Sequence, residues 1–298
     1  VVVVGYGTQK KANLTGAVAT VDVNKTLDSR PIADIGRGLQ GAVAGVNITI
    51  PTGEVGSDPL IKIRGQVGSI SGNNTPLILL DNVEIPSIQM VNPNDVQSIS
   101  VLKDAASSSI YGSKAAFGVI LITTKSGAQS DKFEISYSNN FSWQDPAKKI
   151  EIGGIEALQY TLDAQTNRRE PMPAGGFWRI SPESLEKAIE WQNLYGGKVK
   201  WNDPVVYGRD WFYDGKDKYG YRLYDGAKAM IKNWTPTMTH NLSVNGKSGK
   251  TSYNIGLGYL DQSGMSKTAK KDDFKRYNAS VSVTSEINKY ITVRASSI

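Results

Sequence analysis

Strict alternation of apolar and polar residues in the C-terminal half most constrains what this chain can fold into. The apolar residues Phe133, Ile135, Tyr137, Phe141 and Trp143 all occupy odd-numbered positions, and Glu, Ser and Asn separate them. The same two-residue period recurs at 241–244, 253–259, 277–283 and 290–295. Because successive side chains of a β-strand point to opposite faces, each segment is predicted to form a strand with one apolar face.

The polar positions of these predicted strands carry mainly Ser, Asn, Thr and Gly, with few charged residues. A lipid-facing apolar band, with aromatic residues towards the strand ends and a polar interior, would produce this pattern. A soluble antiparallel sandwich with one face in a core would produce it equally well. The connections at 245–250 and 285–289 are short and the one at 261–273 is long. Since short and long connections alternate in an up-and-down membrane barrel, we favour the barrel.

The first 127 residues differ in composition from the rest of the chain. They contain 3 of the 26 aromatic residues, and their 10 basic residues nearly balance 9 acidic ones. Short apolar runs at 76–80 and 118–124 lie in a background rich in Gly, Val, Ile and Ala. Such runs are typical of buried strands in a mixed domain. The sequence therefore predicts two structural units that meet near residue 128.

Composition argues against an enzyme, a nucleic-acid-binding protein and a helical membrane protein. The chain has no cysteine, a single histidine and a net charge of +6 that is spread over predicted loops and turns. Thiolate and multi-histidine metal sites are thereby excluded, and there is no basic stripe for nucleic acid. No apolar run approaches the roughly 18 to 20 residues of a membrane-spanning helix. No convergent acid/base pair is visible, so we expect no catalytic residue, no metal and no cofactor.

Two glycine-containing motifs resemble nucleotide sites only superficially. The glycines within residues 36–41 fit a dinucleotide fingerprint, but Pro31 lies in the preceding segment and the following residues are too Gly-rich for a firm helix. Residues 246–251 resemble the end of a phosphate-binding loop, yet a predicted strand follows instead of a helix. We interpret residues 246–251 as a hairpin turn.

Two further features also have a structural interpretation. Glu183, Glu186 and Glu190 fall at helical spacing after Ser181, which is a suitable N-cap, so they are predicted to form a solvated helix face rather than a glycosidase pair. His240 has no second imidazole with which to share a metal. We interpret it as a polar residue at the end of a strand.

The opening segment VVVVGYGTQKKANLTGAV closely resembles the junction between the TonB-interacting segment and the plug domain of SusC/RagA family transporters. The segments 38–48, 61–65, 76–85 and 91–127 resemble plug signatures in family order. Later segments, 240–264 and 273–283, resemble early barrel strands of the same family.

The resemblance implies three parts. Residues 1–10 would form a coupling segment and residues 11–127 a plug domain. Residues 128–298 would supply about five strands, with a long outer excursion at 144–237 that includes a helix-like stretch. The expected fold class is an α+β plug domain followed by antiparallel strands of an incomplete transmembrane β-barrel. A plugged barrel of this class has about 22 strands, so the chain is interpreted as a fragment.

The resemblance also assigns functional residues. The TonB-coupling segment consists of Val1, Val2, Val3, Val4, Gly5 and Tyr6, an extended strand donor with little competing local structure. The plug motif consists of Arg64, Gly65, Asp81, Lys103, Asp104, Tyr111 and Gly112. Arg64 is expected to anchor the plug through hydrogen bonds to acidic groups.

Two local details of the plug are also predicted. Asp81 and Asn82 stand where family members usually have Asp-Gly, and Asn tolerates positive φ, so the turn should be kept. Asn94 or Asp95 is expected to cap a short helix at 96–99, which a strand at 100–104 would follow.

By this resemblance the protein takes up a nutrient, an oligosaccharide or a similar molecule, across the bacterial outer membrane. The plug and the N-terminus would face the periplasm. Expected partners are TonB with ExbB and ExbD, a SusD-like surface lipoprotein, the nutrient and outer-membrane lipid, but no nucleic acid. The tryptophans that could stack on sugar rings are Trp178, Trp191, Trp201 and Trp211, although packing within the loop explains each of them at least as well. The alternatives are a non-transporting surface adhesin, a soluble carbohydrate-binding sandwich and an enzyme.

Overall fold

The computed structural model describes residues 2–4, 7–9, 18–22, 34–50, 52–65, 75–127, 131, 133–147, 153–168, 181–216 and 218–297. The chain divides into two compact units. Unit 1 comprises Val1–Gln144, Trp234–Met265 and Lys271–Ile298, and unit 2 comprises Asp145–Asn233 and Ser266–Lys270. None of the helices in these ranges combines the length and the apolar character needed to cross a membrane.

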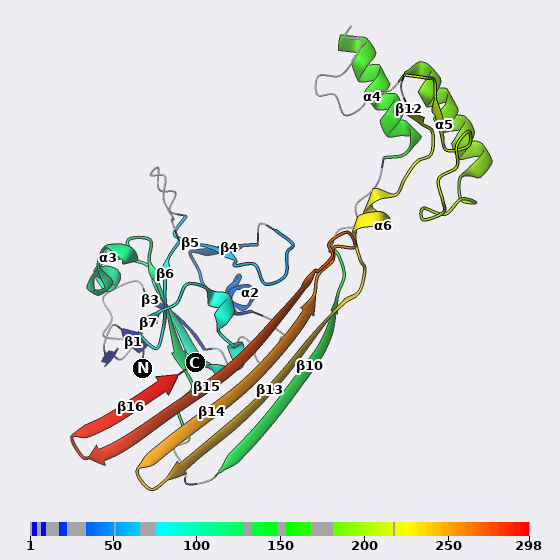
Figure 1. The fold of residues 1–298 in the computed structure, drawn as a ribbon. Coiled ribbons are helices and arrows are strands. Elements are labelled where there is room, and N and C mark those ends of the chain that lie inside the picture. The colour runs from blue at the N-terminus through cyan, green and yellow to red at the C-terminus, as the bar shows by residue number, and fades with distance from the viewer. Residues whose placement is uncertain are drawn as a thin grey trace. The chain divides into compact units, whose positions relative to one another are not determined.

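The N-terminal part of unit 1 is built on a five-stranded mixed sheet (Figure 1). Its strands lie in the order β3 (Val18–Asp22), β8 (Val96–Leu102), β9 (Val119–Thr124), β6 (Leu77–Leu80) and β7 (Val83–Glu84). The pair β6 and β9 is parallel and the other pairs are antiparallel. A mixed domain in this part of the chain was predicted from its short apolar runs.

Apolar side chains cover both faces of the central strand β9. Ile120 and Ile122 belong to one buried cluster, whereas Val119 and Leu121 belong to a second cluster that includes Leu102. Because the strand is buried on both faces, its sequence is a continuous apolar run instead of an alternating one.

Short helices and hairpins complete this domain. They are α2 (Ile35–Leu39), the hairpin of β4 (Val46–Thr49) and β5 (Leu60–Ile63), the 3-10 turns η2 (Ile88–Met90) and η3 (Pro93–Asp95), α3 (Ala105–Ser108) and η4 (Ser109–Ala115). The predicted helix at 96–99 is wrong. Asn92, not Asn94 or Asp95, caps a single turn that ends at Asp95, and β8 begins at Val96. The β-branched Val96 and Ile99 prefer the strand, where they are fully buried.

The N-terminal segment forms a small hairpin of its own. Strand β1 (Val2–Val4) pairs antiparallel with β2 (Gly7–Gln9). The prediction that β1 has little competing local structure is therefore wrong, because the backbone of β2 supplies hydrogen-bonding partners within five residues of it.

A second five-stranded sheet, entirely antiparallel, follows the N-terminal domain in unit 1 (Figure 1). It consists of β10 (Glu134–Gln144), β13 (Thr235–Ser248), β14 (Thr251–Ser263), β15 (Asp273–Asn288) and β16 (Ile291–Ser297). We call it the long sheet. Its strands are paired in chain order, and the turns at 249–250 and 289–290 are tight. The predicted fold class, an α+β domain followed by antiparallel strands, is confirmed.

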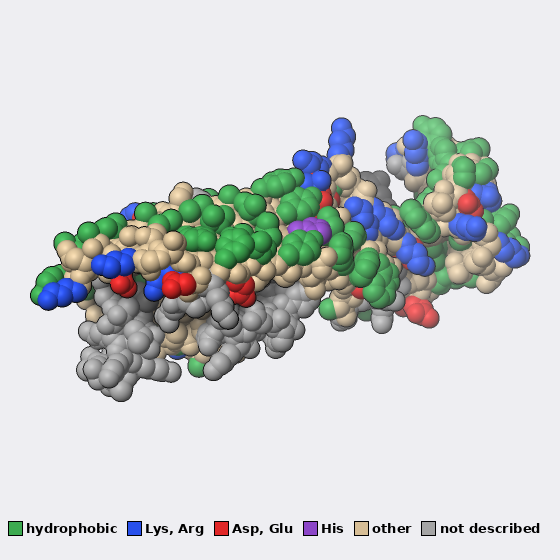
Figure 2. Space-filling view, turned by 90° about the horizontal axis from the view of Figure 1, so that it is seen from below, with side chains coloured by type: hydrophobic (Ala, Val, Ile, Leu, Met, Phe, Trp, Pro, Cys, Tyr) green, Lys and Arg blue, Asp and Glu red, His purple; other side chains and the backbone are tan. Residues whose placement is uncertain are grey.

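The two faces of the long sheet differ as the alternation predicted. Ile135, Tyr137, Leu257 and Tyr277 are exposed on one face, over which Figure 2 shows hydrophobic side chains spread along the strands. The other face carries Asn254, Gln262 and Ser282, which are buried. Since polar residues are buried and apolar residues are exposed, this sheet is inverted relative to a sheet of a water-soluble core.

Unit 2 contains α4 (Ile155–Arg168), α5 (Pro182–Tyr195), the hairpin of β11 (Trp211–Tyr213) and β12 (Lys218–Gly220), and α6 (Gly226–Met230). The predicted cap of α5 is confirmed. The Ser181 hydroxyl accepts from the amide of Ser184, Ser184 Oγ accepts from the amide of Ser181, and Pro182 occupies the first turn. Glu183, Glu186 and Glu190 are exposed on this helix, as expected.

Candidate functional site

The N-terminal domain contacts the polar face of the long sheet through side chains that project from β15. Arg276 donates from Nη1 to the carbonyl oxygen of Gln89 over 2.8 Å. Asn278 donates from Nδ2 to the carbonyl oxygen of Met90, also over 2.8 Å. Both acceptors are main-chain carbonyl oxygens of η2. The contact therefore does not depend on which side chains η2 carries.

A pair of glycines on the same face of β14 makes room for the turn at residues 92–95. We call Gly256 and Gly258 the glycine notch. A Cβ atom added to Gly258 would lie 2.5 Å from Nδ2 of Asn92, and one added to Gly256 would lie 2.5 Å from Oδ1 of Asp95. Both distances are far below van der Waals contact. The absence of side chains therefore lets Asn92 reach the sheet, where its Nδ2 donates to Oδ1 of Asn241 over 2.9 Å.

Asp95 is the carboxylate that faces the glycine notch. Burial raises its pKa, because the charged form loses hydration, whereas a hydrogen bond from Ser280 and the positive charges of Lys125 and Arg276 oppose this shift. The net shift is upward.

A third contact joins β16 to the turn after β6. Arg294 Nη2 donates to Oγ1 of Thr124 over 3.2 Å and lies 3.7 Å from Oδ2 of Asp81. Asp81 in turn accepts from the amide of Thr124 over 3.0 Å. Asp81 and Asn82 have φ angles of 46° and 71°, so the predicted tolerance of this turn for Asn is confirmed.

The other residues of the predicted plug motif do not gather at this interface. Lys103 donates to the carbonyl of Ala44 over 2.6 Å, Asp104 caps α3, and Tyr111 packs against the cluster around Leu121. Gly112, with φ 70° and ψ −157°, forms a kink within η4. Asp104, Tyr111 and Gly112 belong to the connection between β8 and β9, whereas Lys103 joins it to Ala44.

Arg64 and Gly65 end β5 with φ angles of 56° and 63°. Arg64 is exposed, and none of the carboxylates in the described ranges forms an ion pair with it. Its role as an anchor stays a prediction. The arginines that do bridge the domain and the long sheet are Arg276 and Arg294, which project from the sheet.

The predicted coupling segment is described in part. Val2, Val3 and Val4 form β1, whereas Val1, Gly5 and Tyr6 lie outside the described residues.

The predicted sugar-stacking tryptophans occupy three different environments. Trp178 lies outside the described residues. Trp191 is buried, and its Nε1 donates to Oδ1 of Asp210 over 2.9 Å. Trp211, the first residue of β11, contacts the ring of Tyr207 edge-on. The Lys218 ammonium lies 5.6 Å from the centroid of the Trp211 ring. Trp201 is 42% exposed. Trp191 thus serves packing, and Trp201 is the most accessible of the three that the structure describes.

Asp210 is the centre of a buried ionic cluster in unit 2. Arg209 donates from Nη2 to Oδ2 over 2.7 Å, Val206 donates its amide over 2.8 Å, and Arg222 Nη1 lies 3.5 Å from the same oxygen. The Arg209 guanidinium, followed by the amide of Val206 and the indole of Trp191, holds the pKa of Asp210 well below its usual range despite burial. The carboxylate therefore stays charged and joins α5 to the segments around β11.

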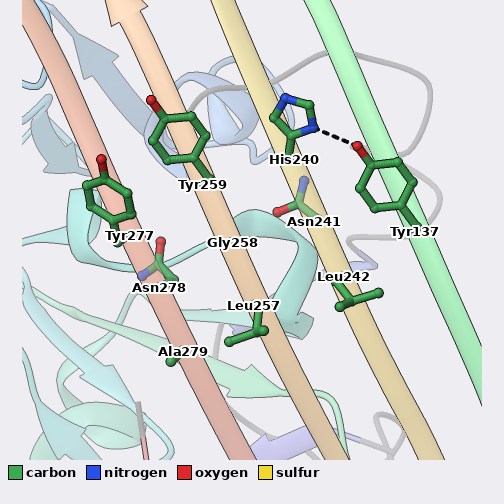
Figure 3. A pocket seen from close by; sticks show the side chains of 10 residues that line it. All are labelled: Tyr137, His240, Asn241, Leu242, Leu257, Gly258, Tyr259, Tyr277, Asn278 and Ala279. Carbon is green, nitrogen blue, oxygen red and sulfur yellow. Dashed lines mark hydrogen bonds between the residues drawn. The ribbon is translucent and has the colours of Figure 1, made fainter.

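The exposed face of the long sheet has a cavity of about 450 Å³, lined mostly by Tyr137, His240, Leu257, Tyr259 and Tyr277 (Figure 3). Tyr137 Oη and His240 Nδ1 are 2.7 Å apart. His240 also stacks on Tyr259, with ring centroids 6.3 Å apart. The rings of Tyr137, His240, Tyr259 and Tyr277 lie side by side across the strands, and Leu242 and Leu257 lie next to them (Figure 3). The cavity therefore has a mainly apolar lining.

The prediction that His240 ends a strand is wrong. β13 begins at Thr235, and His240 pairs with Asn139 and Tyr259 in the interior of the sheet. Pro236 obscured this start in the sequence, but proline is tolerated near the first residue of a strand. Groups of three or more potential metal ligands are absent from the residues that the structure describes.

Sequence reasoning missed Asn241, Gly256, Gly258, Arg276 and Asn278. The alternation placed all five on the polar face, but Ser, Asn and Gly are ordinary residues there. The available signal was Arg276, one of few charged side chains on a face that is otherwise mostly Ser, Asn, Thr and Gly.

The TonB-dependent receptor plug domain family matches residues 10–119. TonB-dependent receptor P26 of Formosa agariphila is 32% identical over 276 residues, which cover 90% of this chain and 23% of the relative. TonB-dependent receptor SusC of Bacteroides thetaiotaomicron is 28% identical over 292 residues, or 95% of this chain and 24% of the relative. The chain thus spans about a quarter of the length of these curated relatives.

The chain is also similar to a solved structure. The RagAB peptide importer in its open-open state matches 99% of this chain and 31% of its own, with a TM-score of 0.73 and 30% identity. The similarity therefore extends over the N-terminal domain, the long sheet and unit 2.

Proposed function

The chain belongs to the TonB-dependent receptors, of the SusC and RagA kind, and we propose that the whole protein actively imports an oligosaccharide across the bacterial outer membrane. On this proposal residues 11–127 are the plug, residues 128–298 begin the barrel, and residues 144–237 form its first outer excursion. The plug and the N-terminus would face the periplasm, and outer-membrane lipid would surround the exposed face of the long sheet.

The observation that carries this proposal is the hydrogen-bonded contact between the plug and the polar face of the long sheet. We call this contact the seat of the plug. Hydrogen bonds between the sheet and the plug include those that Arg276, Asn278 and Arg294 donate from the sheet and the one that Asn92 donates from the plug, and two of the acceptors are main-chain carbonyls. Each such bond contributes about 1 kcal/mol net, because water replaces it when the contact opens. A seat built from such bonds holds the plug at rest and still allows a pull on the plug to break it bond by bond.

The pull would act through residues 1–10. We propose that TonB, energised with ExbB and ExbD, pairs with the Val1–Tyr6 segment by strand addition. Because β1 already pairs with β2, TonB would exchange one set of main-chain hydrogen bonds for another. Exchange of this kind costs little net free energy, so the segment can be captured and released repeatedly.

Two further elements of the proposal concern partners and substrate. A SusD-like surface lipoprotein would cover the receptor and deliver the nutrient, as the similarity to SusC suggests. Peptide import is the second candidate, because the similar solved structure is named a peptide importer. Arg64 would add an anchor between the plug and parts of the barrel beyond this chain.

A substitution in the coupling segment of the complete receptor tests the proposal. Val3→Pro removes a main-chain donor and should reduce uptake to the level of a strain without TonB. Val3→Ile keeps the β-branched side chain and the donor, and should transport normally. Uptake would be measured with radiolabelled oligosaccharides and, in parallel, labelled oligopeptides. Equal uptake by both variants would instead support a surface adhesin or a passive channel.

A further inference from the structure

Unit 2 contains an open polar pocket, and none of its lining residues belongs to the contact between the plug and the long sheet. It lies between the C-terminal end of α5, the turn that follows this helix and the start of α6, and its volume is about 520 Å³. We call it the Trp201 pocket; its accessible rim includes Gln192, Gly197, Trp201, Asn202, Asp225 and Lys228. Its volume falls within the range of sites that hold small ligands.

The floor of the pocket is preformed. Arg222 is fully buried there, and its guanidinium donates to the carbonyl of Asp203 over 3.0 Å in addition to its contact with Asp210. Trp191 is held by the same carboxylate. Because the Asp210 cluster fixes these side chains, the pocket does not need to be assembled when a ligand arrives.

Trp201 supplies an accessible aromatic surface. Its side chain is 42% exposed even though the ammonium of Lys267 lies 5.3 Å from the ring centroid. Lys267 is itself held in place, because its ammonium donates to the carbonyl oxygen of Lys228 over 2.5 Å and its amide donates to that of Met230 over 2.7 Å. The ring is therefore held in position and is still open to a flat, weakly polar partner.

The rim supplies hydrogen-bonding groups with unused capacity. The side-chain amides of Gln192 and Asn202 form no hydrogen bond with any residue that the structure describes. An amide both donates and accepts, as a sugar hydroxyl does. Asp225 adds a carboxylate that is 3.0 Å from the ammonium of Lys228, and the amide of Lys228 holds the pKa of Asp225 below its usual value.

We propose that the Trp201 pocket binds a neutral saccharide ring, with Trp201 beneath the ring and Gln192, Asn202 and Asp225 contacting its hydroxyl groups. The inference rests on the proposed function, since it supplies a capture site for the imported oligosaccharide. A saccharide suits the lining better than a peptide does. The Trp201 ring offers an apolar surface next to a polar rim, as a sugar ring requires. The opposite charges of Asp225 and Lys228 balance each other, which suits a neutral ligand.

Calorimetry on the complete receptor in detergent tests the proposal. The probes are maltohexaose, laminarihexaose and xylohexaose, with tetraalanine as the peptide arm. We expect at least one oligosaccharide to bind, and Trp201→Ala to weaken it about ten-fold, the loss of one ring-stacking contact. Trp201→Phe should restore part of the affinity. Tyr160→Ala, which removes an exposed aromatic side chain from α4 of the same unit, should leave the affinity unchanged.

The pocket assignment is overturned if none of the oligosaccharides binds, if Trp201→Ala binds as tightly as the natural protein, or if tetraalanine binds in a Trp201-dependent way. None of these results bears on the dependence of uptake on TonB. Conversely, uptake that is insensitive to Val3→Pro removes the proposed import function and leaves the binding measurement standing.

Discussion

At the scale of single residues, the glycine notch sets how closely the plug can approach the long sheet. Asn92 and Asp95 occupy the volume that side chains on Gly258 and Gly256 would fill. Neither glycine has a φ in the left-handed region, so their backbone conformation would accept any residue. The two glycines are needed because they leave room for Asn92 and Asp95. Any larger residue at either position would push the plug away from the sheet.

We predict that Gly258→Val in the complete receptor makes the closed channel leaky. The added side chain displaces Asn92 and breaks its hydrogen bond to Asn241, which costs about 1 kcal/mol and raises the unseated fraction about five-fold. Conductance in planar bilayers without substrate or TonB measures the leak. Leu257→Val, next to the notch on the opposite face, is the control. A leak no greater than that control would show that the plug does not depend on the notch.

At the scale of elements, the Asp210 cluster holds unit 2 together where apolar contacts are few. One buried carboxylate receives bonds from Trp191 on α5, from Arg209 and from the amide of Val206. Arg222 is buried beside it. A buried charge with several partners is costly to leave uncompensated, so the elements should loosen together when the carboxylate is neutralised.

Asp210→Asn is therefore expected to destabilise unit 2 by about 3 kcal/mol. In the natural protein the same stability should be lost in acid. The folded pKa of Asp210 is depressed, so its contribution is present above the unfolded value of about 3.9 and disappears as the pH falls through the folded value. Hydrogen exchange of the α5 amides measures both effects, with Glu186→Gln on the exposed side of α5 as the control. Unchanged exchange in Asp210→Asn would contradict this role.

At the scale of the whole molecule, the long sheet has two open edges. In the described part of the chain β10 pairs only with β13, and β16 pairs only with β15. One face of this sheet is apolar and exposed. Unpaired edges together with such a face favour association with other chains unless lipid, detergent or further strands cover them.

We expect the 298-residue chain by itself to self-associate in buffer and to become monodisperse in detergent micelles. Sedimentation velocity with and without detergent measures the difference. Replacing both Leu257 and Val281 by Lys, on the apolar face, should reduce association in buffer. A monodisperse monomer without detergent would instead favour the soluble sandwich.

The sequence by itself determined the two faces of the long sheet and the cap of α5. Alternation between residues 133 and 283 set which side chains share a face, because a strand has a fixed period of two. The Ser181 cap followed from local geometry. The periodicity also made the polar face of the long sheet visible before any contact was known.

Only the tertiary structure decided which residues of that face form the seat, and which tryptophans are accessible. Arg276 and Gln89 are 187 positions apart, and Trp191 and Asp210 meet across a turn and a loop. Partners at such separations depend on how the elements pack, and no local pattern encodes it. For the same reason the plug anchor was expected at Arg64, whereas the contacts observed in the described chain run from Arg276 and Arg294.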